Sequence, residues 1–279
     1  MHWCGTAELK TKNQRLLNII ADLGSVLVAY SGGVDSTLLL RACAEALGPS
    51  RVLAVTARSE TLAADEEADA RRLAAAMGIE HLVVPISELD DDEFVRNPPE
   101  RCYLCKRIRY GLLSSLARER GLHWVVDGAN ADDSRDYRPG LRAASELGIR
   151  SPLREAGLNK DDIRELSRAY DLPTWDKPSY ACLASRIPYG CPITAEKLRQ
   201  IDAAETFLRG LGFKQVRVRH HGELARIEVP AEKLASLVAD DLAPRVTARL
   251  KEIGFTYVAL DLNGYRAGSL NEALQRHSQ

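Results

Sequence analysis

The chain has 279 residues, of which 45% are hydrophobic and 28% charged, and its formal net charge is −1. This length and composition are typical of a globular protein with one large or two modest domains. The balanced charge excludes the overall positive potential that would favour binding of nucleic acid. No apolar run approaches the roughly 20 residues needed to cross a bilayer, and the N-terminus lacks the basic-then-apolar order of a signal peptide. We therefore expect a cytoplasmic protein with no membrane partner, whose six cysteines are free, metal-bound or catalytic.

Strands and helices alternate along the first half of the chain. We predict strands at 26–30, 52–56, 81–86 and 124–127, and helices at 34–46, 61–77, 108–120 and 161–170. Such alternation predicts an α/β fold with a doubly wound parallel sheet covered by helices on both faces.

The second half predicts a smaller C-terminal α/β domain. It contains expected helices at 195–211 and 231–239 and expected strands at 215–220, 224–229 and 257–260. Three prolines break regular structure between the two parts. We therefore expect a domain over 1–171, an ordered linker over 172–190 that carries Cys182, and a domain over 191–279 for substrate binding or oligomerisation.

A glycine loop joins the first strand to the first predicted helix, in the string Ala29-Tyr30-Ser31-Gly32-Gly33-Val34-Asp35-Ser36. Adjacent glycines let the backbone approach an anion, the N-terminus of the following helix favours negative charge, and the two serines add hydroxyl donors. The expected ligand is therefore phosphate. The loop lacks the lysine of a Walker A motif and the third glycine of a dinucleotide fingerprint. It resembles the PP-loop of ATP pyrophosphatases, which implies an adenine nucleotide alpha hydrolase-like fold that binds ATP and transfers AMP.

Polar residues follow two other predicted strands. Because ligands bind at the carboxyl ends of parallel strands, we expect Thr56 and Asp127-Gly128 to converge with the PP-loop on one cleft, with the main chain at Thr56 reading the adenine edge. Carboxylates suit Mg²⁺, so we predict Asp127 and Asp132 as its ligands, within a cluster that also holds Asp133 and Asp136. A solvated acidic loop is the alternative. Asp35 organises the loop, helps hold magnesium or stabilises the helix dipole.

Two cysteine motifs invite a chemical interpretation. Cys102 and Cys105 form a C-x-x-C, whose spacing lets both sulfurs reach one metal or cluster; a redox pair and two half-buried cysteines at a helix start are alternatives. A structural zinc site would need two further ligands, for which Cys182 and Cys191 are available. Cys182 lies near the cations Lys177 and Arg186 in the sequence, which would favour its thiolate, so it is a candidate nucleophile. The alternative is a small buried hydrophobe.

Several motifs in chain order resemble the LarE family of ATP-dependent sulfur transferases, which help make the nickel-pincer nucleotide cofactor of lactate racemase. The resemblance covers nearly the whole chain, with alanine at position 129 where threonine is expected. The matching stretches are Pro173-Thr174-Trp175-Asp176-Lys177-Pro178-Ser179, Ala181-Cys182-Leu183-Ala184-Ser185-Arg186, Pro188-Tyr189-Gly190, the region from Asp127 to Asp133 with Asp136 to Gly140, Arg217 to Gly222, and Gly264-Tyr265-Arg266 with Gly268-Ser269-Leu270-Asn271.

The resemblance implies that ATP adenylates a carboxylate of pyridinium-3,5-dicarboxylate mononucleotide and that sulfur then replaces AMP. In one family variant the cysteine at the position of Cys182 surrenders its own sulfur and becomes dehydroalanine. In another, three cysteines hold a [4Fe–4S] cluster that delivers sulfide. The C-x-x-C favours the cluster version, with Cys102, Cys105 and Cys182 as ligands. The resemblance also implies a homo-oligomer and a possible sulfide donor as partner.

Cations elsewhere in the chain suit the phosphates of such substrates. Arg217 and Arg219 alternate on one predicted strand and so share a face, and guanidinium forks match phosphate; we predict that they hold the mononucleotide phosphate. An exposed strand with ordinary charges is the alternative. Lys106 and Arg186 would neutralise phosphate charge near the cysteines. Competing functions are an amide-forming ligase like NAD or GMP synthetase, a tRNA thiolase, and a non-catalytic nucleotide-sensing or zinc-binding module.

Overall fold

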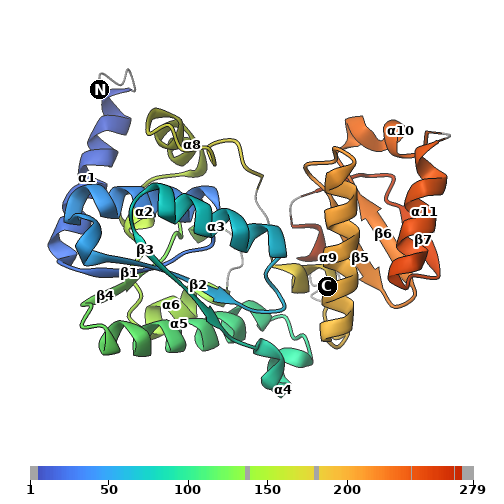
Figure 1. Ribbon diagram of the computed structural model, residues 1–279, viewed down its shortest axis with the longest axis horizontal. Coiled ribbons are helices and arrows are strands. Elements are labelled where there is room, and N and C mark those ends of the chain that lie inside the picture. The colour runs from blue at the N-terminus through green and yellow to red at the C-terminus, as the bar shows by residue number, and fades with distance from the viewer. Residues whose placement is uncertain (1–5, 136–138, 179–181, 240, 267, 272–279) are drawn as a thin grey trace. The chain divides into compact units, whose positions relative to one another are not determined.

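The computed structural model describes residues 6–135, 139–178, 182–239, 241–266 and 268–271. The chain divides into two compact units (Figure 1). Unit 1 comprises residues 1–59, 64–87 and 100–180, and unit 2 comprises residues 60–63, 88–99 and 181–279. The predicted linker over 172–190 spans the division after residue 180, and its separate role stays a prediction. Asp136 of the predicted carboxylate cluster, Cys4 and the stretch 179–181 lie outside the described residues.

Unit 1 is built on a parallel sheet, which confirms the predicted fold class. Its described strands have the order β3-β2-β1-β4 (Figure 1). The strands are β1 (Val26–Ala29), β2 (Val52–Arg58), β3 (Glu80–Pro85) and β4 (Trp124–Val126). Val26 pairs with Val52 on one side and Trp124 on the other. Strand order therefore reverses at β1, and ligands of open α/β sheets bind at such a switch point.

Helices cover both faces of this sheet, as its alternating side chains require. They are α1 (Ala7–Leu23), α2 (Val34–Leu47), α3 (Ala64–Ala76), α5 (Arg101–Glu119), α6 (Pro139–Glu146), α7 (Pro152–Glu155) and α8 (Lys160–Ala169). The sequence analysis missed α1, and it placed the start of α5 at residue 108 instead of Arg101.

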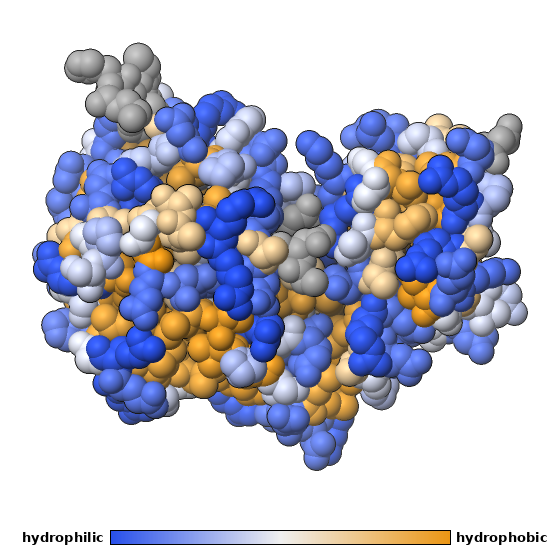
Figure 2. All heavy atoms as spheres, in the orientation of Figure 1, coloured by the Kyte–Doolittle hydropathy of each residue, from blue (hydrophilic) through white to orange (hydrophobic). Residues whose placement is uncertain are grey.

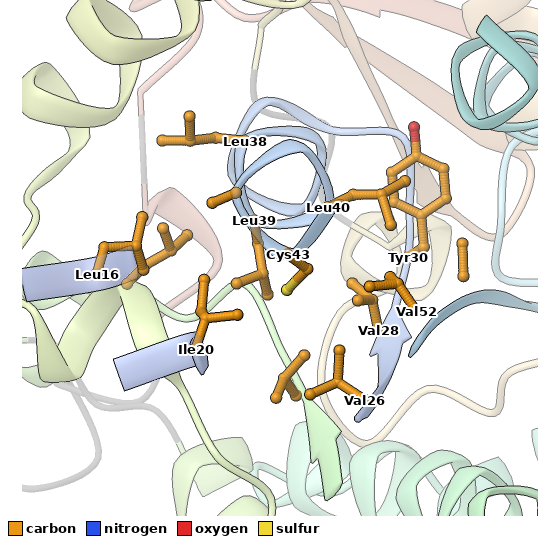
Figure 3. Packing of buried hydrophobic residues seen from close by; sticks show 14 of the residues in the cluster. Leu16, Ile20, Val26, Val28, Tyr30, Leu38, Leu39, Leu40, Cys43 and Val52 are labelled. Carbon is orange, nitrogen blue, oxygen red and sulfur yellow. The ribbon is translucent and has the colours of Figure 1, made fainter. Parts of the chain in front are cut away.

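Side chains along β1 point alternately to the two faces of the sheet, and the core of unit 1 forms one cluster on each face. Val28 packs with Ile20 of α1 and with Cys43 of α2 (Figure 3), whereas Leu27 faces the opposite cluster with Tyr110 of α5. Cys43 is completely buried, and burial raises the pKa of its thiol. This confirms Cys43 as a core residue and leaves it no reactive role.

Unit 2 is the smaller α/β unit and contains a sheet of order β5-β6-β7. The strands are β5 (Arg217–His221), β6 (Leu224–Glu228), antiparallel to β5, and β7 (Tyr257–Leu260), parallel to β6. The helices are α4 (Asp92–Val95), α9 (Ala195–Gly210), α10 (Leu234–Leu237) and α11 (Leu242–Ile253). The helix expected over 231–239 is a 3₁₀ turn followed by the short α10, and α11 was not predicted.

Both units carry a mixed surface. Figure 2 shows hydrophilic and hydrophobic residues interspersed over the visible face of each unit. None of the helices among the described residues is both long and apolar enough to cross a membrane.

His220 of β5 makes the stability of unit 2 sensitive to acid. Its Nε2 bonds Gln200 Oε1 at 2.9 Å, its ring packs on Phe255, and its buried Nδ1 has no partner within the described part of the chain. Burial, reinforced by the charge of Lys197, lowers the pKa of His220 below its ordinary value of 6.5. The unfolded chain therefore takes up the proton first as the pH falls, and the free energy of unfolding drops below pH 6.5.

We expect His220→Gln to reduce this acid sensitivity, because the variant has no imidazole to protonate. Urea unfolding of both proteins between pH 7.5 and pH 5 gives the comparison, with the slope of unfolding free energy against pH smaller in the variant. Equal slopes would contradict the assignment.

Candidate active site

The PP-loop forms the turn between β1 and α2 that the sequence predicts. Gly32 takes a φ of +70°, a backbone conformation that glycine adopts without strain. Gly33, the residue before α2, provides no side-chain cap, so side chains leave the first helical N–H groups available. The hydroxyls of Ser31 and Ser36 lie 3.1 Å apart, and Ser36 also donates to the Gly33 carbonyl. Ala29 ends the strand and Val34 begins the helix, which leaves a cradle of N–H and O–H donors suited to an anion.

Asp35 in the first turn of α2 is paired with a lysine that the sequence analysis missed. Its Oδ2 lies 2.5 Å from Lys160 Nζ, and its Oδ1 accepts a bond from Asn130 Nδ2. The main-chain N–H of Lys160 donates to Asp132 Oδ2. Asp35 and Asp132 thus both contact Lys160. No local pattern singles out Lys160, because its two carboxylate partners are distant in the sequence.

The ends of β1, β2 and β4 meet beside the PP-loop, as the sequence analysis expected. A Cβ atom on Gly128 would lie 3.1 Å from the Ser36 nitrogen, a tight contact, so glycine suits the close approach of the chain after β4 to α2. Thr56 Oγ1 donates to the Tyr30 carbonyl at 2.8 Å and lies 2.8 Å from His81 Nε2. Because this hydroxyl has one proton, His81 Nε2–H is the donor in the second bond.

Asp127 is bound by its own protein neighbours. Its carboxylate, buried at the end of β4, accepts bonds from the Tyr110 hydroxyl at 2.5 Å, the Ser151 hydroxyl at 2.7 Å and the Ala129 N–H. Burial and the charge of Asp127 raise the pKa of Tyr110 well above its ordinary value, which keeps that hydroxyl a donor. Lys106 Nζ lies 3.8 Å from Asp127. This arrangement indicates that Asp127 organises the cleft, and its predicted role as a magnesium ligand stays a prediction.

Cys102 and Cys105 lie on the first two turns of α5. Cys102 is exposed and Cys105 is half-buried. Positions three apart on a helix share a face, so the pair has the placement that two ligands of one metal or cluster need. Lys106, beside Cys105, extends its ammonium over the Tyr110 ring at 5.5 Å. No group of three or more His, Cys, Asp or Glu side chains among the described residues is arranged to hold a metal ion. Cys182 belongs to the other unit, and the three-cysteine ligand set stays a prediction.

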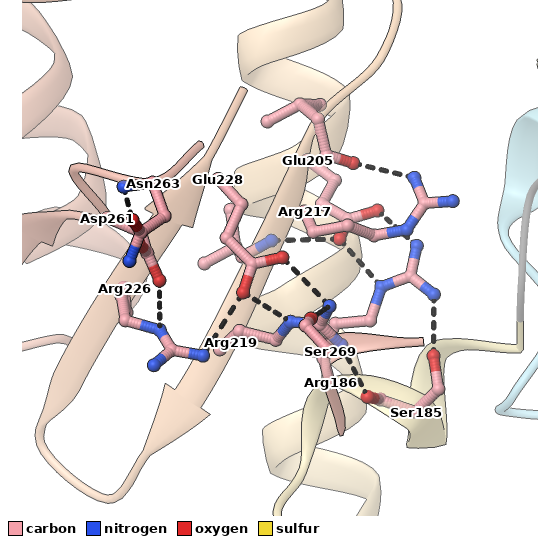
Figure 4. Close-up of polar contacts among 12 residues, drawn as sticks. Ser185, Arg186, Glu205, Arg217, Arg219, Arg226, Glu228, Asp261, Asn263 and Ser269 are labelled. Atoms are coloured by element: carbon pink, nitrogen blue, oxygen red, sulfur yellow. Dashed lines mark hydrogen bonds and ion pairs between the residues drawn. The ribbon is translucent and has the colours of Figure 1, made fainter. Parts of the chain in front are cut away.

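In unit 2, Cys182 is exposed at the start of a 3₁₀ turn that covers Leu183–Arg186. A buried bidentate ion pair, called a fork below, holds this turn (Figure 4). Arg186 is 1% exposed and donates from Nε and Nη2 to the two oxygens of Glu205 on α9, both at 2.8 Å. Its remaining Nη1 donates to the Cys182 carbonyl at 3.1 Å and to the Ser185 hydroxyl. Arg186 therefore fixes the main chain of Cys182 and leaves the thiol exposed.

Arg219 of β5 makes a second fork of the same design. Its Nε and Nη2 donate to the two oxygens of Glu228 on β6, and its Nη1 donates to the Ser185 carbonyl at 2.9 Å. Nη2 also bonds Ser269 Oγ (Figure 4). Sequence spacing gave no sign of either fork, because the charged partners come from different elements.

Arg217 lies on the same strand, where its guanidinium is buried and covers the Tyr265 ring at 5.2 Å. Burial, followed by the charge of Arg186, lowers the pKa of Arg217 to about 10. An anion beside Arg217 would relieve this cost and raise that pKa again.

Short segments from elsewhere in the chain anchor both ends of the Cys182 turn. The Leu183 N–H donates to the Thr61 carbonyl, and Asn97 Nδ2 donates to the carbonyls of Ile187, Pro188 and Cys191. Asn97 is fully buried and adopts a left-handed φ of 56°. Its amide thus replaces the regular main-chain pairing that this proline-containing loop lacks.

Lys177, expected beside Cys182, instead contacts the PP-loop within unit 1. Its Nζ donates to the Gly32 carbonyl at 3.2 Å and to Asp69 Oδ2 at 3.0 Å. The predicted effect of Lys177 on the Cys182 thiol, which belongs to the other unit, stays a prediction.

Comparisons with known proteins agree with the geometry. The sequence profile of the family described as "NAD synthase" matches residues 15–122. The chain is 42% identical over 272 residues to the "pyridinium-3,5-bisthiocarboxylic acid mononucleotide synthase" of Lactiplantibacillus plantarum, with 97% of each chain covered. It is 44% identical over 268 residues to the "uncharacterized protein slr1717" of a Synechocystis species, covering 96% of this chain and 100% of the relative. It is 31% identical to "uncharacterized protein MJ0830" of Methanocaldococcus jannaschii, covering 87% of this chain and 91% of the relative.

Proposed function

The chain belongs to the LarE family of pyridinium-3,5-bisthiocarboxylic acid mononucleotide synthases, and we propose that it is an ATP-dependent sulfur transferase that converts carboxylates of a pyridinium mononucleotide to thiocarboxylates. A carboxylate oxygen attacks the α-phosphorus of ATP, and pyrophosphate leaves. Sulfur then attacks the acyl carbon, and AMP leaves with the original carboxylate oxygen. Adenylation is needed because a carboxylate is a poor electrophile.

The PP-loop supports the first half of this reaction. Its donors, from Ser31 to Ser36, are suited to the polyphosphate, and Gly128 lets the loop after β4 approach the same helix N-terminus. ATP would enter with Mg²⁺, a hard cation that carboxylates such as Asp35 and Asp132 can hold alongside phosphate oxygens. Lys160 contacts both aspartates and would exchange partners with the ion.

Cys182 supports the second half, and its exposure on a rigid turn is the observation that carries the proposal. If Cys182 is the sulfur donor, its sulfur first forms a thioester with the substrate. Loss of the Cα proton then breaks the Cβ–S bond, which leaves the thiocarboxylate and dehydroalanine. A [4Fe–4S] cluster held by Cys102, Cys105 and Cys182 would supply sulfide instead. We propose the cluster version, because Cys102 and Cys105 share the exposed first turns of α5.

Arg217 and Arg219 are proposed to hold the phosphate of the mononucleotide. The lowered pKa of Arg217 supports a larger role in phosphate binding for Arg217 than for Arg219, because an anion would offset the cost of the buried charge on Arg217. Arg219 would add positive potential while its fork holds the Cys182 turn. We further propose a homo-oligomer that works in the cytoplasm and receives sulfide from a donor partner.

One assay tests the function against its competitors. The protein, prepared anaerobically, receives ATP, Mg²⁺ and pyridinium-3,5-dicarboxylate mononucleotide, and we follow AMP, pyrophosphate and the product mass. We expect gain of sulfur. Gain of nitrogen in the presence of ammonia would favour an amide-forming ligase, and absence of turnover would favour a nucleotide-sensing module. Iron content and brown colour decide between the cluster and Cys182 as sulfur source.

Two aspartates of the cleft should respond differently to substitution. We expect Asp35→Asn to raise the Mg²⁺ concentration needed for half-maximal pyrophosphate release about tenfold or more, because it loses a ligand charge. We expect Asp127→Asn to leave that concentration within about twofold and to lower the free energy of unfolding by about 1–3 kcal/mol, because it disturbs buried bonds. A magnesium titration and urea unfolding give both values. A large magnesium shift in Asp127→Asn would instead support the predicted role of Asp127 as a magnesium ligand.

A further inference from the structure

Three segments distant in the sequence meet at Gly32 of the PP-loop. A Cβ atom on Gly32 would lie 3.1 Å from the Cα of Ala70, so α3 packs directly on the loop backbone. This packing brings Asp69 beside the loop. Lys177 completes the arrangement, since its ammonium bonds both the Gly32 carbonyl and the Asp69 carboxylate. None of the functions proposed above accounts for this contact of Lys177 with Gly32 and Asp69.

The Lys177 ammonium lies where an anion is expected to bind. The Lys177 side chain is 14% exposed, and its ammonium, bonded to the Gly32 carbonyl, adjoins a helix N-terminus that no side chain caps. A phosphate group in the loop would place strong acceptor oxygens near a cation that now bonds a neutral carbonyl. Its carboxylate partner, Asp69, is 35% exposed, and ion pairs that reach solvent contribute little. The four-carbon stem of lysine lets the ammonium change partners while its main chain stays in place.

The main chain around Lys177 is held firmly to α8. Arg164 donates from Nη1 to the Trp175 carbonyl at 2.7 Å and from Nη2 to the Lys177 carbonyl at 3.1 Å. Arg168 stacks over the Trp175 ring at 4.1 Å. The main chain at Lys177 is therefore fixed, and a change of partner involves its side chain alone.

We propose that Lys177 binds the pyrophosphate group of ATP in the PP-loop. With the loop empty, Asp69 and the Gly32 carbonyl hold the ammonium. With pyrophosphate present, the ammonium moves to the phosphate oxygens while the main chain of Lys177 stays in place. Lys177 is then a catalytic residue of the adenylation step, and this inference rests on the ATP-cleaving half of the proposed function.

Pyrophosphate binding tests the proposed role of Lys177 directly, without the pyridinium substrate. Calorimetry with magnesium pyrophosphate should show about tenfold weaker binding to Lys177→Met than to the unaltered protein, because a charge-assisted bond is lost. Lys177→Arg should recover part of the affinity. Asp69→Asn should bind at least as tightly as the unaltered protein, because it loses only the competing partner. Lys251→Met, on the exposed part of α11, is the matched control.

Thermal unfolding of Lys177→Met confirms that the variant is folded, so that weaker binding reports the missing ammonium.

The outcomes separate this inference from the proposed function. Equal pyrophosphate affinity in Lys177→Met and the unaltered protein would overturn the inference even if sulfur transfer is observed. Pyrophosphate binding that depends on Lys177, in a protein that never adds sulfur to the pyridinium nucleotide, would support the inference and refute the proposed function.

Discussion

Replacing Arg186 with methionine is expected to cost unit 2 about 3–5 kcal/mol in the free energy of unfolding. Arg186 and Glu205 are each 1% exposed, so the variant leaves a carboxylate buried without its main partner. The substitution also removes the bond to the Cys182 carbonyl. Arg209 Nη1 lies 3.6 Å from Glu205 and still offsets part of its charge in the variant. We therefore expect the loss of unfolding free energy to fall toward the lower end of this range. Urea unfolding followed by a probe in unit 2 measures the change.

Two further variants make this expectation specific. Arg186→Met combined with Glu205→Leu should recover part of the lost stability, because the orphaned carboxylate is gone. Arg249→Met, which breaks an exposed ion pair with Glu252 on α11, should change the unfolding free energy by less than about 0.5 kcal/mol. A loss below about 1 kcal/mol for Arg186→Met would show that the fork is not a principal support of the turn.

The sequence predicted the nucleotide cleft well because its information is local. An apolar run, adjacent glycines and a helical pattern determine β1, the PP-loop and α2 within one continuous stretch. The convergence of Thr56 and Gly128 on that loop follows from the rule that parallel strands end at one edge. The same local pattern could not separate the roles of neighbouring carboxylates. Asp127 is bound by Tyr110 and Ser151, which only the packed sheet brings together.

The forks around Cys182 show what spacing alone could not predict. Arg217 and Arg219 alternate on β5, as expected, but their common face is buried against other elements of unit 2. Arg219 therefore meets Glu228 of β6 and the Ser185 carbonyl, whereas the sequence analysis expected either substrate phosphate or an exposed strand with ordinary charges. Which partners these arginines meet depends on the strand register and on the path of an irregular turn. Neither can be predicted from one amino-acid sequence.

Replacing Cys182 with serine is expected to abolish sulfur transfer, by about 10³-fold or more, while ATP-dependent pyrophosphate release continues. The thiol is exposed, and its turn is fixed through main-chain bonds that serine can also make, so the fold should persist. The PP-loop lies in the other unit, so the substitution leaves its donors unchanged. Product mass and pyrophosphate release, measured in the same reaction, give the two rates.

Cys191→Ser is the matched control, because Cys191 is also an exposed thiol of unit 2, and both rates should stay unchanged. Cys102→Ser separates the two possible sulfur sources. If a cluster delivers sulfide, this variant loses iron and sulfur transfer together, and the Cys182 peptide keeps its mass. If Cys182 is sacrificed, the variant remains active and the peptide loses the elements of hydrogen sulfide after one turnover. Sulfur transfer that survives in Cys182→Ser would refute both routes, since each requires this sulfur atom.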